Sequence, residues 1–187
     1  MKRFLIKALP AALLLSVGAY STLAAASDGD ITFNGKVVAA ACTLNGFNGG
    51  NSANGAVMAL ATVTPSSFNF AGGYAAMKDF TIDLKDCDTT TMKNAMVSFS
   101  GTPDTTDGAI LKNTQTNGPA TGVGIAILEN DGTTPIAIDG GKPSKPQALT
   151  TGNTSLLFKV AYKANTSTPE VEPGGVSAKT FVDITYN

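Results

Sequence analysis

The chain has 187 residues, of which only 14% are charged, its formal net charge is −1, and it contains no histidine. The single arginine is Arg3, so the chain lacks the basic patches that nucleic acids and anionic membranes require, and neither is an expected partner. The absence of histidine also removes the usual general base and most zinc sites, which disfavours an enzyme.

The first predicted element is a secretory signal peptide in residues 1–26. Three basic residues precede a short apolar run, and small residues allow cleavage after Ala24 or Ala26. The run is broken by Pro10 and Gly18 and is too short for a membrane-spanning helix. Cleavage leaves about 161 residues, which suits one domain with a sizeable core. It removes three of the 13 basic residues and none of the 14 acidic ones, so the net charge becomes −4.

The rest of the sequence predicts an all-β sandwich. Short apolar runs are separated by clusters of Gly, Asn, Asp, Pro and Thr at intervals of roughly ten residues. The Gly- and Asn-rich stretch Asn45–Asn54 is expected to be a loop, and Asp131-Gly132 favours a tight hairpin turn. The expected strands are Ile31–Ala41, Val57–Val63, Phe80–Leu84, Ala95–Ser100, Gly122–Leu128, Pro135–Ile138, Ser155–Tyr162 and Thr180–Tyr186.

The first and last expected strands both alternate apolar and polar residues. The residues on one face are Ile31, Phe33, Gly35 and Val37 in the first strand, and Val182, Ile184 and Tyr186 in the last. A long apolar strand at a sheet edge promotes association unless another strand covers it. A domain that lacks a covering strand at one end and has a spare strand at the other can polymerise head to tail, which predicts a filament subunit.

The only two cysteines are Cys42 and Cys87. Two cysteines in an exported chain most simply form one disulfide bond with each other. Two metal-ligating thiolates are the alternative, which the lack of histidine and of a CxxC motif disfavours.

Three acidic clusters are the remaining candidates for chemistry. Asp83, Asp86 and Asp88 surround Cys87, and a carboxylate pair of the glycosidase type is formally possible there. Asp104–Gly108 and Asn130–Gly132 faintly resemble calcium loops but lack the ligand spacing of an EF-hand. An acidic loop beside a disulfide and Asp-Gly turns explain all three, so no catalytic residue, metal site or cofactor is expected.

The sequence resembles the pilins of chaperone–usher fimbriae, most closely the major subunits of type 1 fimbriae. The C-terminus is similar to the family's chaperone-recognition pattern, with a penultimate Tyr186, alternating Ile184 and Val182, and Gly174 fourteenth from the end. The other segments that carry the resemblance are Phe33–Cys42, Phe80–Asp88 and Gly122–Leu128.

The resemblance implies an incomplete immunoglobulin-like β-sandwich in residues 39–187 that lacks its final strand. A periplasmic chaperone would lend a strand to this groove and bind the carboxylate of Asn187. At the outer-membrane usher, the extension of the next subunit, residues 27–38, would replace the chaperone strand by donor-strand exchange. Gly35 would enter a site too shallow for a side chain. The expected product is an adhesive surface fimbria, exported through the periplasm and built from identical or related subunits.

Two other classes of protein remain as alternatives. A secreted carbohydrate-binding domain would normally use aromatic platforms, but the chain has no Trp and only four Tyr. A periplasmic enzyme is disfavoured by the missing histidines. Both would purify as free monomers, whereas a pilin gives chaperone-bound monomers or ladders that resist mild denaturants.

Overall fold

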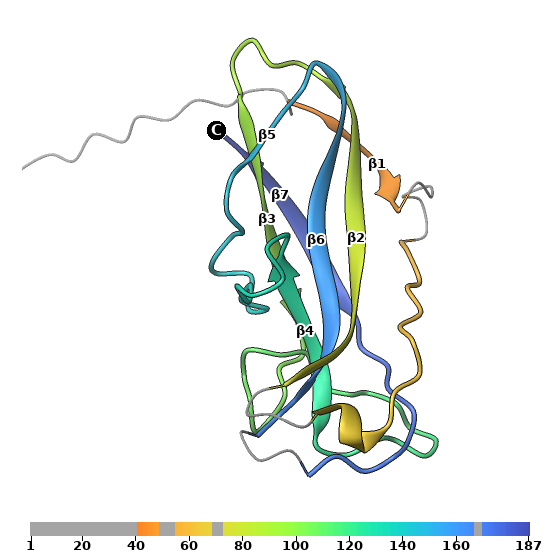
Figure 1. Ribbon diagram of the computed structural model, residues 1–187. Helices are drawn as coiled ribbons and strands as arrows, with labels where there is room; N and C mark the ends of the chain where they lie inside the picture. Colours follow the sequence, from red (N-terminus) through yellow and green to blue (C-terminus); the bar gives the residue numbers. More distant parts are fainter. Residues whose placement is uncertain (1–40, 49–54, 69–72, 167–169) are drawn as a thin grey trace, which may run out of the picture. The chain divides into compact units, whose positions relative to one another are not determined.

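The structure is a computed structural model, and it describes residues 41–48, 55–68, 73–166 and 170–187 (Figure 1). All of these residues belong to one compact unit, which runs from Val38 to Asn187. The predicted signal peptide and the strand that begins at Ile31 lie outside the described residues.

Two antiparallel sheets form the described fold, as the all-β prediction requires. The four-stranded sheet has the order β1-β2-β6-β4, and the three-stranded sheet has the order β5-β3-β7. A short 3-10 helix, η2 (Pro65–Phe68), precedes β2. The strands are β1 (Thr43–Phe47), β2 (Tyr74–Cys87), β3 (Asn94–Gly101), β4 (Val123–Glu129), β5 (Gln147–Ala148), β6 (Gly152–Ala164) and β7 (Thr180–Tyr186).

The core lies between the two sheets and centres on three phenylalanines. Phe80 of β2 and Phe158 of β6 stack with ring centroids 5.6 Å apart, and Phe99 of β3 meets Phe158 edge-on at 5.3 Å. All three side chains are buried. Successive side chains of a strand point to opposite faces of the sheet, and these three lie on the faces that meet the other sheet. This aromatic contact holds the three-stranded sheet against the four-stranded one.

The predicted disulfide joins Cys42 and Cys87 and is buried in the same core. Cys42 comes just before β1, and Cys87 is the last residue of β2. The Asp88 N–H donates to the Ala41 carbonyl at 2.7 Å, so backbone pairing continues around the bond. The disulfide ties the start of the sandwich to its longest strand.

The structure departs from the predicted strands in several places, of which three concern β1, β2 and the segment after β4. β1 extends to Phe47, inside the segment predicted as a loop, because a register shift between Leu44 and Gly46 absorbs the small residues. β2 is much longer than Phe80–Leu84, and its outer parts lose simple alternation at two positive-φ residues, Ala76 and Asp86. The segment predicted as strand Pro135–Ile138 makes only one isolated bridge among the described residues, between Pro135 and Leu128.

Candidate functional site

The candidate site is the outer edge of β7. This strand pairs with β3 along its whole length, from Thr180 opposite Gly101 to Tyr186 opposite Ala95. β7 is the last strand in the order of its sheet, so its second edge has no strand partner among the described residues. An unpaired edge presents backbone N–H and C=O groups that another strand can bind.

The inward face of β7 is only half-buried. Val182, Ile184 and Tyr186 contact the main core but remain partly exposed. Their partners across the ladder on β3, Phe99, Val97 and Ala95, are each 0% exposed. Both rows face the same core, so the difference arises because no described strand lies beyond β7. Partial burial also raises the pKa of the Tyr186 phenol, because desolvation disfavours its charged form.

A second segment, residues 55–64, also lacks a strand partner. It was predicted as the strand Val57–Val63, but it forms no ladder with any described strand. Met58 and Leu60 nevertheless pack partly buried against the same core as the β7 side chains. The Lys78 ammonium also donates a hydrogen bond to the Ala59 carbonyl of this segment, at 3.0 Å.

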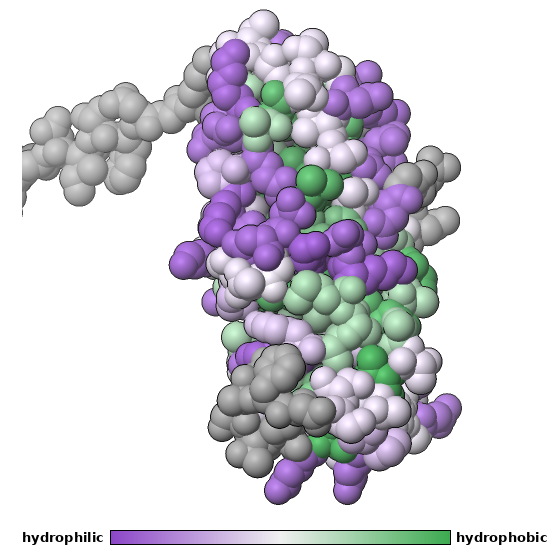
Figure 2. All heavy atoms as spheres, in the orientation of Figure 1, coloured by the Kyte–Doolittle hydropathy of each residue, from purple (hydrophilic) through white to green (hydrophobic). Residues whose placement is uncertain are grey.

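The two faces of segment 55–64 differ sharply in exposure. Val57 is fully exposed, whereas Met58 next to it is half-buried. Hydrophobic residues reach the surface in the lower right of the face in Figure 2, along the path that this segment takes in Figure 1. Segment 55–64 and the β7 edge are therefore two apolar, unpaired strand-like surfaces on one core.

The opposite edge of β3 is closed by the chain itself. The Gly140 and Ser144 N–H groups donate to the carbonyls of Phe99 and Val97, and the Gly101 N–H donates to the Ile138 carbonyl. The Ser144 hydroxyl in turn accepts a hydrogen bond from the Val97 N–H at 3.0 Å. The three-stranded sheet is thus sealed beside β3 and open beside β7.

The acidic clusters singled out in the sequence accept hydrogen bonds within the fold: Asp104 and Asp131 cap their own turns, whereas Asp83 lies in β2. The Asp104 carboxylate accepts from the N–H groups of Thr106 and Asp107. The Asp131 carboxylate accepts from the N–H groups of Thr133 and Thr134, which hold its pKa well below the usual range. The Asp83 carboxylate accepts from the Ser155 hydroxyl at 2.7 Å. These carboxylates serve as hydrogen-bond acceptors within the fold.

Comparison with known proteins identifies the chain. Residues 31–187 match the family described as fimbrial protein. The chain belongs to this family. The subunit is therefore a structural component of a surface fimbria and not an enzyme, and subunits of this kind polymerise with other pilins.

Curated relatives agree with this assignment, and a solved structure shares the fold. Fimbrial subunit ElfA of Escherichia coli strain K12 is 38% identical over 163 residues, which cover 87% of this chain and 86% of the relative. The probable major fimbrial subunit LpfA of Escherichia coli O157:H7 is 36% identical over 187 residues, which cover 100% of this chain and 99% of the relative. A solved chaperone–usher pilus structure aligns with a TM-score of 0.62 at 22% identity, and the alignment covers 86% of this chain and 96% of that chain.

The fold of this fimbrial subunit is an incomplete immunoglobulin-like sandwich, as the resemblance implied. The position that a final strand would take beside β7 is the unpaired edge described above. No helix in the part of the chain that the structure describes is long and apolar enough to cross a bilayer.

The structure brings some of the predicted site residues together, and others lie outside the residues that it describes. Val182, Ile184 and Tyr186 lie on one face of β7, and Asn187 follows them, hydrogen-bonded to Asn94. Ile31, Phe33, Gly35 and Val37 lie outside the described residues. Met58 and Leu60 lie in the predicted strand Val57–Val63 but were given no functional role, and the apolar run around them was the signal that could have found them.

Gly174 precedes β7 and lies against another backbone segment. A Cβ added there would meet the Ala120 nitrogen at 2.3 Å and the carbonyl carbon of Pro119 at 2.4 Å. The neighbouring Gly175 donates its N–H to the Gly118 carbonyl, and its own carbonyl accepts from the Ala120 N–H. The approach to β7 is therefore anchored by close backbone packing.

Gly174→Ala is expected to destabilise the subunit by about 1–3 kcal/mol, because backbone atoms cannot move aside for the added methyl group. Gly175→Ala is the matched control, since its Cβ would meet only the flexible Gln115 side chain. Urea unfolding of the two variants, each with the β7 edge occupied by the same donor peptide, measures the difference. Equal stability of the two variants would contradict the packing argument.

Proposed function

We propose that this fimbrial subunit polymerises by donor-strand exchange at the β7 edge. The extension of one copy, with Ile31, Phe33, Gly35 and Val37 facing inward, pairs with the free edge of β7 in the next copy. The single observation that carries the proposal is the half-buried row of Val182, Ile184 and Tyr186 beside the fully buried row of β3. Addition of a strand to an open sheet edge is an established mode of recognition.

The added strand would stabilise this edge in two ways, through backbone hydrogen bonds and through burial of apolar side chains. Its backbone pairs with the free N–H and C=O groups of β7, and its large side chains cover apolar surface that is now half-exposed. Each large apolar side chain moved from water into a core contributes about 1.5–3 kcal/mol. Segment 55–64 supplies a second unpaired backbone, so the inserted strand can be held on both sides.

The proposal includes the route of the subunit to the fibre. The signal peptide is removed after Ala24 or Ala26, and a periplasmic chaperone then occupies the β7 edge and contacts the C-terminal residues up to Asn187. The outer-membrane usher exchanges the chaperone strand for residues 27–38 of the next subunit. The compact unit that begins at Val38 supports a domain of residues 39–187 preceded by an extension that can be donated.

A peptide-exchange assay tests the proposal. Synthetic peptides that span Asp28–Ala39 are added to the chaperone-bound subunit, and chaperone release is followed over time. The wild-type peptide is expected to displace the chaperone. The Gly35→Leu peptide is expected to exchange much more slowly, because overfilling a packed site costs about 1–3 kcal/mol.

The peptide format separates two explanations for Gly35. If this glycine only relieves backbone strain within its own subunit, a peptide has no fold to lose, and the Gly35→Leu peptide will exchange at the wild-type rate. Equal rates would therefore refute the shallow-site explanation. Failure of the wild-type peptide to exchange at all would refute donor-strand exchange at this edge.

A further inference from the structure

A glutamine side chain takes the place of a strand at a second sheet edge. Gln147 lies in β5 of the three-stranded sheet, but its side-chain amide reaches β6 of the four-stranded sheet. Its Oε1 accepts from the Leu157 N–H at 2.8 Å, and its Nε2 donates to the Leu157 carbonyl at 3.1 Å. The amide thus makes the same pair of hydrogen bonds that a residue of a neighbouring strand would make.

The position of this contact follows from where β4 ends. The β4–β6 ladder runs from Val123 opposite Ala164 to Glu129 opposite Phe158. Leu157 is the next residue along β6, but the chain leaves the ladder after Glu129 in a turn closed by the Gly132 N–H donating to the Glu129 carbonyl. Without Gln147, the Leu157 backbone would have no partner on this side of β6 among the described residues.

The surroundings of this edge would favour association. The Leu157 side chain is 43% exposed, which makes it one of the few large hydrophobic residues on the described surface. A surface hollow of about 260 Å³ borders Gln147 and is also lined by Glu129, Asn130, Asp131 and Lys145. An accessible strand edge beside an exposed leucine is the arrangement that native proteins normally protect.

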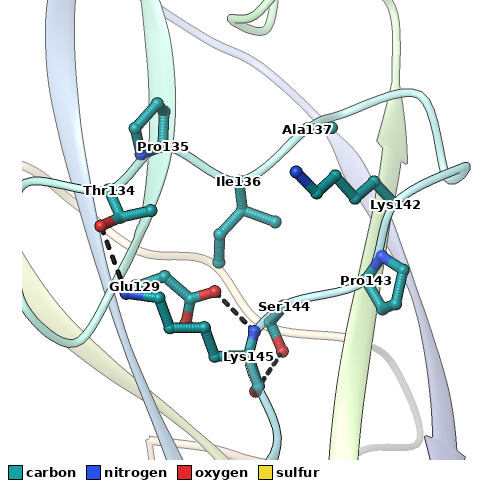
Figure 3. Close-up of a pocket in the computed structure, with 9 residues that line it drawn as sticks. All are labelled: Glu129, Thr134, Pro135, Ile136, Ala137, Lys142, Pro143, Ser144 and Lys145. Carbon is teal, nitrogen blue, oxygen red and sulfur yellow. Dashed lines mark hydrogen bonds between the residues drawn. The ribbon is translucent and has the colours of Figure 1, made fainter.

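The segment that carries Gln147 is held in place by the β4 hairpin. The Lys145 N–H donates to a carboxylate oxygen of the buried Glu129 at 2.6 Å (Figure 3). The Lys145 ammonium forms an ion pair with Asp131 at 2.9 Å. These contacts hold the chain two residues before Gln147 against the β4 hairpin, so the Gln147 amide extends from an anchored segment.

We infer that Gln147 closes a second strand-accepting edge at Leu157 and thereby restricts strand addition to β7. When the side-chain amide is removed, the occupant of the opened edge is β6 of a second copy of this chain, since two identical edges can pair antiparallel. The inference goes beyond the proposed function, and it depends on that function only because the β7 edge must be filled before the β6 edge is assayed.

The test measures the mass of the mature subunit by sedimentation in excess Asp28–Ala39 peptide, which occupies the β7 edge. The wild-type subunit is expected to remain a monomer with one peptide. Gln147→Ala is expected to form a species of twice that mass as the concentration rises. Gln147→Ala/Leu157→Lys is expected to return to the monomer, because an edge lysine opposes strand pairing without restoring either hydrogen bond.

Two controls separate edge closure from a general loss of stability. Gln147→Ala/Thr116→Lys adds the same charge on an exposed loop residue and should still dimerise. Amide hydrogen exchange at Leu157 should become about two- to tenfold faster in Gln147→Ala, whereas exchange at Lys159, which pairs with β4, should not change.

A Gln147→Ala subunit that stays monomeric, or rescue by Thr116→Lys as well as by Leu157→Lys, would overturn the inference. Unchanged exchange at Leu157 would overturn it as well. A wild-type subunit that binds no peptide would count against donor-strand exchange, and exchange at Leu157 would then decide the inference by itself.

Discussion

Deletion of residues 25–37 is expected to give a subunit that binds its chaperone and accepts a donor strand but cannot extend a filament. The β7 edge and segment 55–64 are intact in such a subunit, because both lie outside the deleted segment. The subunit has lost the strand that it would donate. It should therefore end each chain that it enters, and the expected loss of polymer is complete when it is the only subunit present.

Two measurements check this prediction. Electron microscopy should find no fimbriae when the deleted subunit replaces the wild type, and progressively shorter fimbriae when the two are mixed. The deleted subunit should still be displaced from its chaperone by the Asp28–Ala39 peptide, which shows that it remains folded. Fimbriae of normal length built from the deleted subunit alone would contradict the proposed mechanism.

Phe158→Ala is expected to lower the free energy of unfolding by about 3–5 kcal/mol. The Phe158 ring is fully buried and contacts both Phe80 and Phe99, so its removal leaves a cavity at the junction of the two sheets. A domain of this size has only about 5–15 kcal/mol of stability, so the variant should be scarce in the cell.

Phe181→Ala is the matched control, because Phe181 lies on the outer face of β7 and is 61% exposed. The Phe181 ring makes a cation–π contact with the Lys179 ammonium, which lies 5.0 Å from the ring centroid. An exposed contact of this kind is worth about 0.5–1 kcal/mol. Denaturant unfolding of the peptide-complemented subunit measures both variants, and a loss below 1 kcal/mol for Phe158→Ala would show that the core adjusts to the cavity.

Much of the fold was predictable from local patterns. Short apolar runs bounded by turn-forming residues predicted the central parts of β2, β3, β4, β6 and β7. The single cysteine pair in an exported chain predicted the Cys42–Cys87 disulfide. Alternation also identified Val182, Ile184 and Tyr186 as one face of the last strand, because the period of a strand is independent of what packs against it.

Other features could not be predicted because local composition argued against them. β1 extends into a Gly- and Asn-rich stretch that usually forms loops, and pairing with the long strand β2 overrides that preference. In the opposite direction, Val57–Val63 is a short apolar run that was predicted as a strand but finds no strand to pair with among the described residues. In both cases the available partner, and not the sequence of the segment, decides the outcome.

The sequence by itself thus determined that the chain is an all-β fimbrial subunit, which residues share a face of its last strand, and which cysteines are bonded. The sequence also led us to expect an uncovered last strand, but only the tertiary structure decided which strands flank that open edge and where another edge is closed. β7 is open because it lies at the end of the order β5-β3-β7, and β6 is closed at Leu157 because Gln147 reaches it from the other sheet. Strand order joins residues far apart in the chain, and the Gln147 contact joins two different sheets. The two-residue period of a strand carries no information about either kind of neighbour.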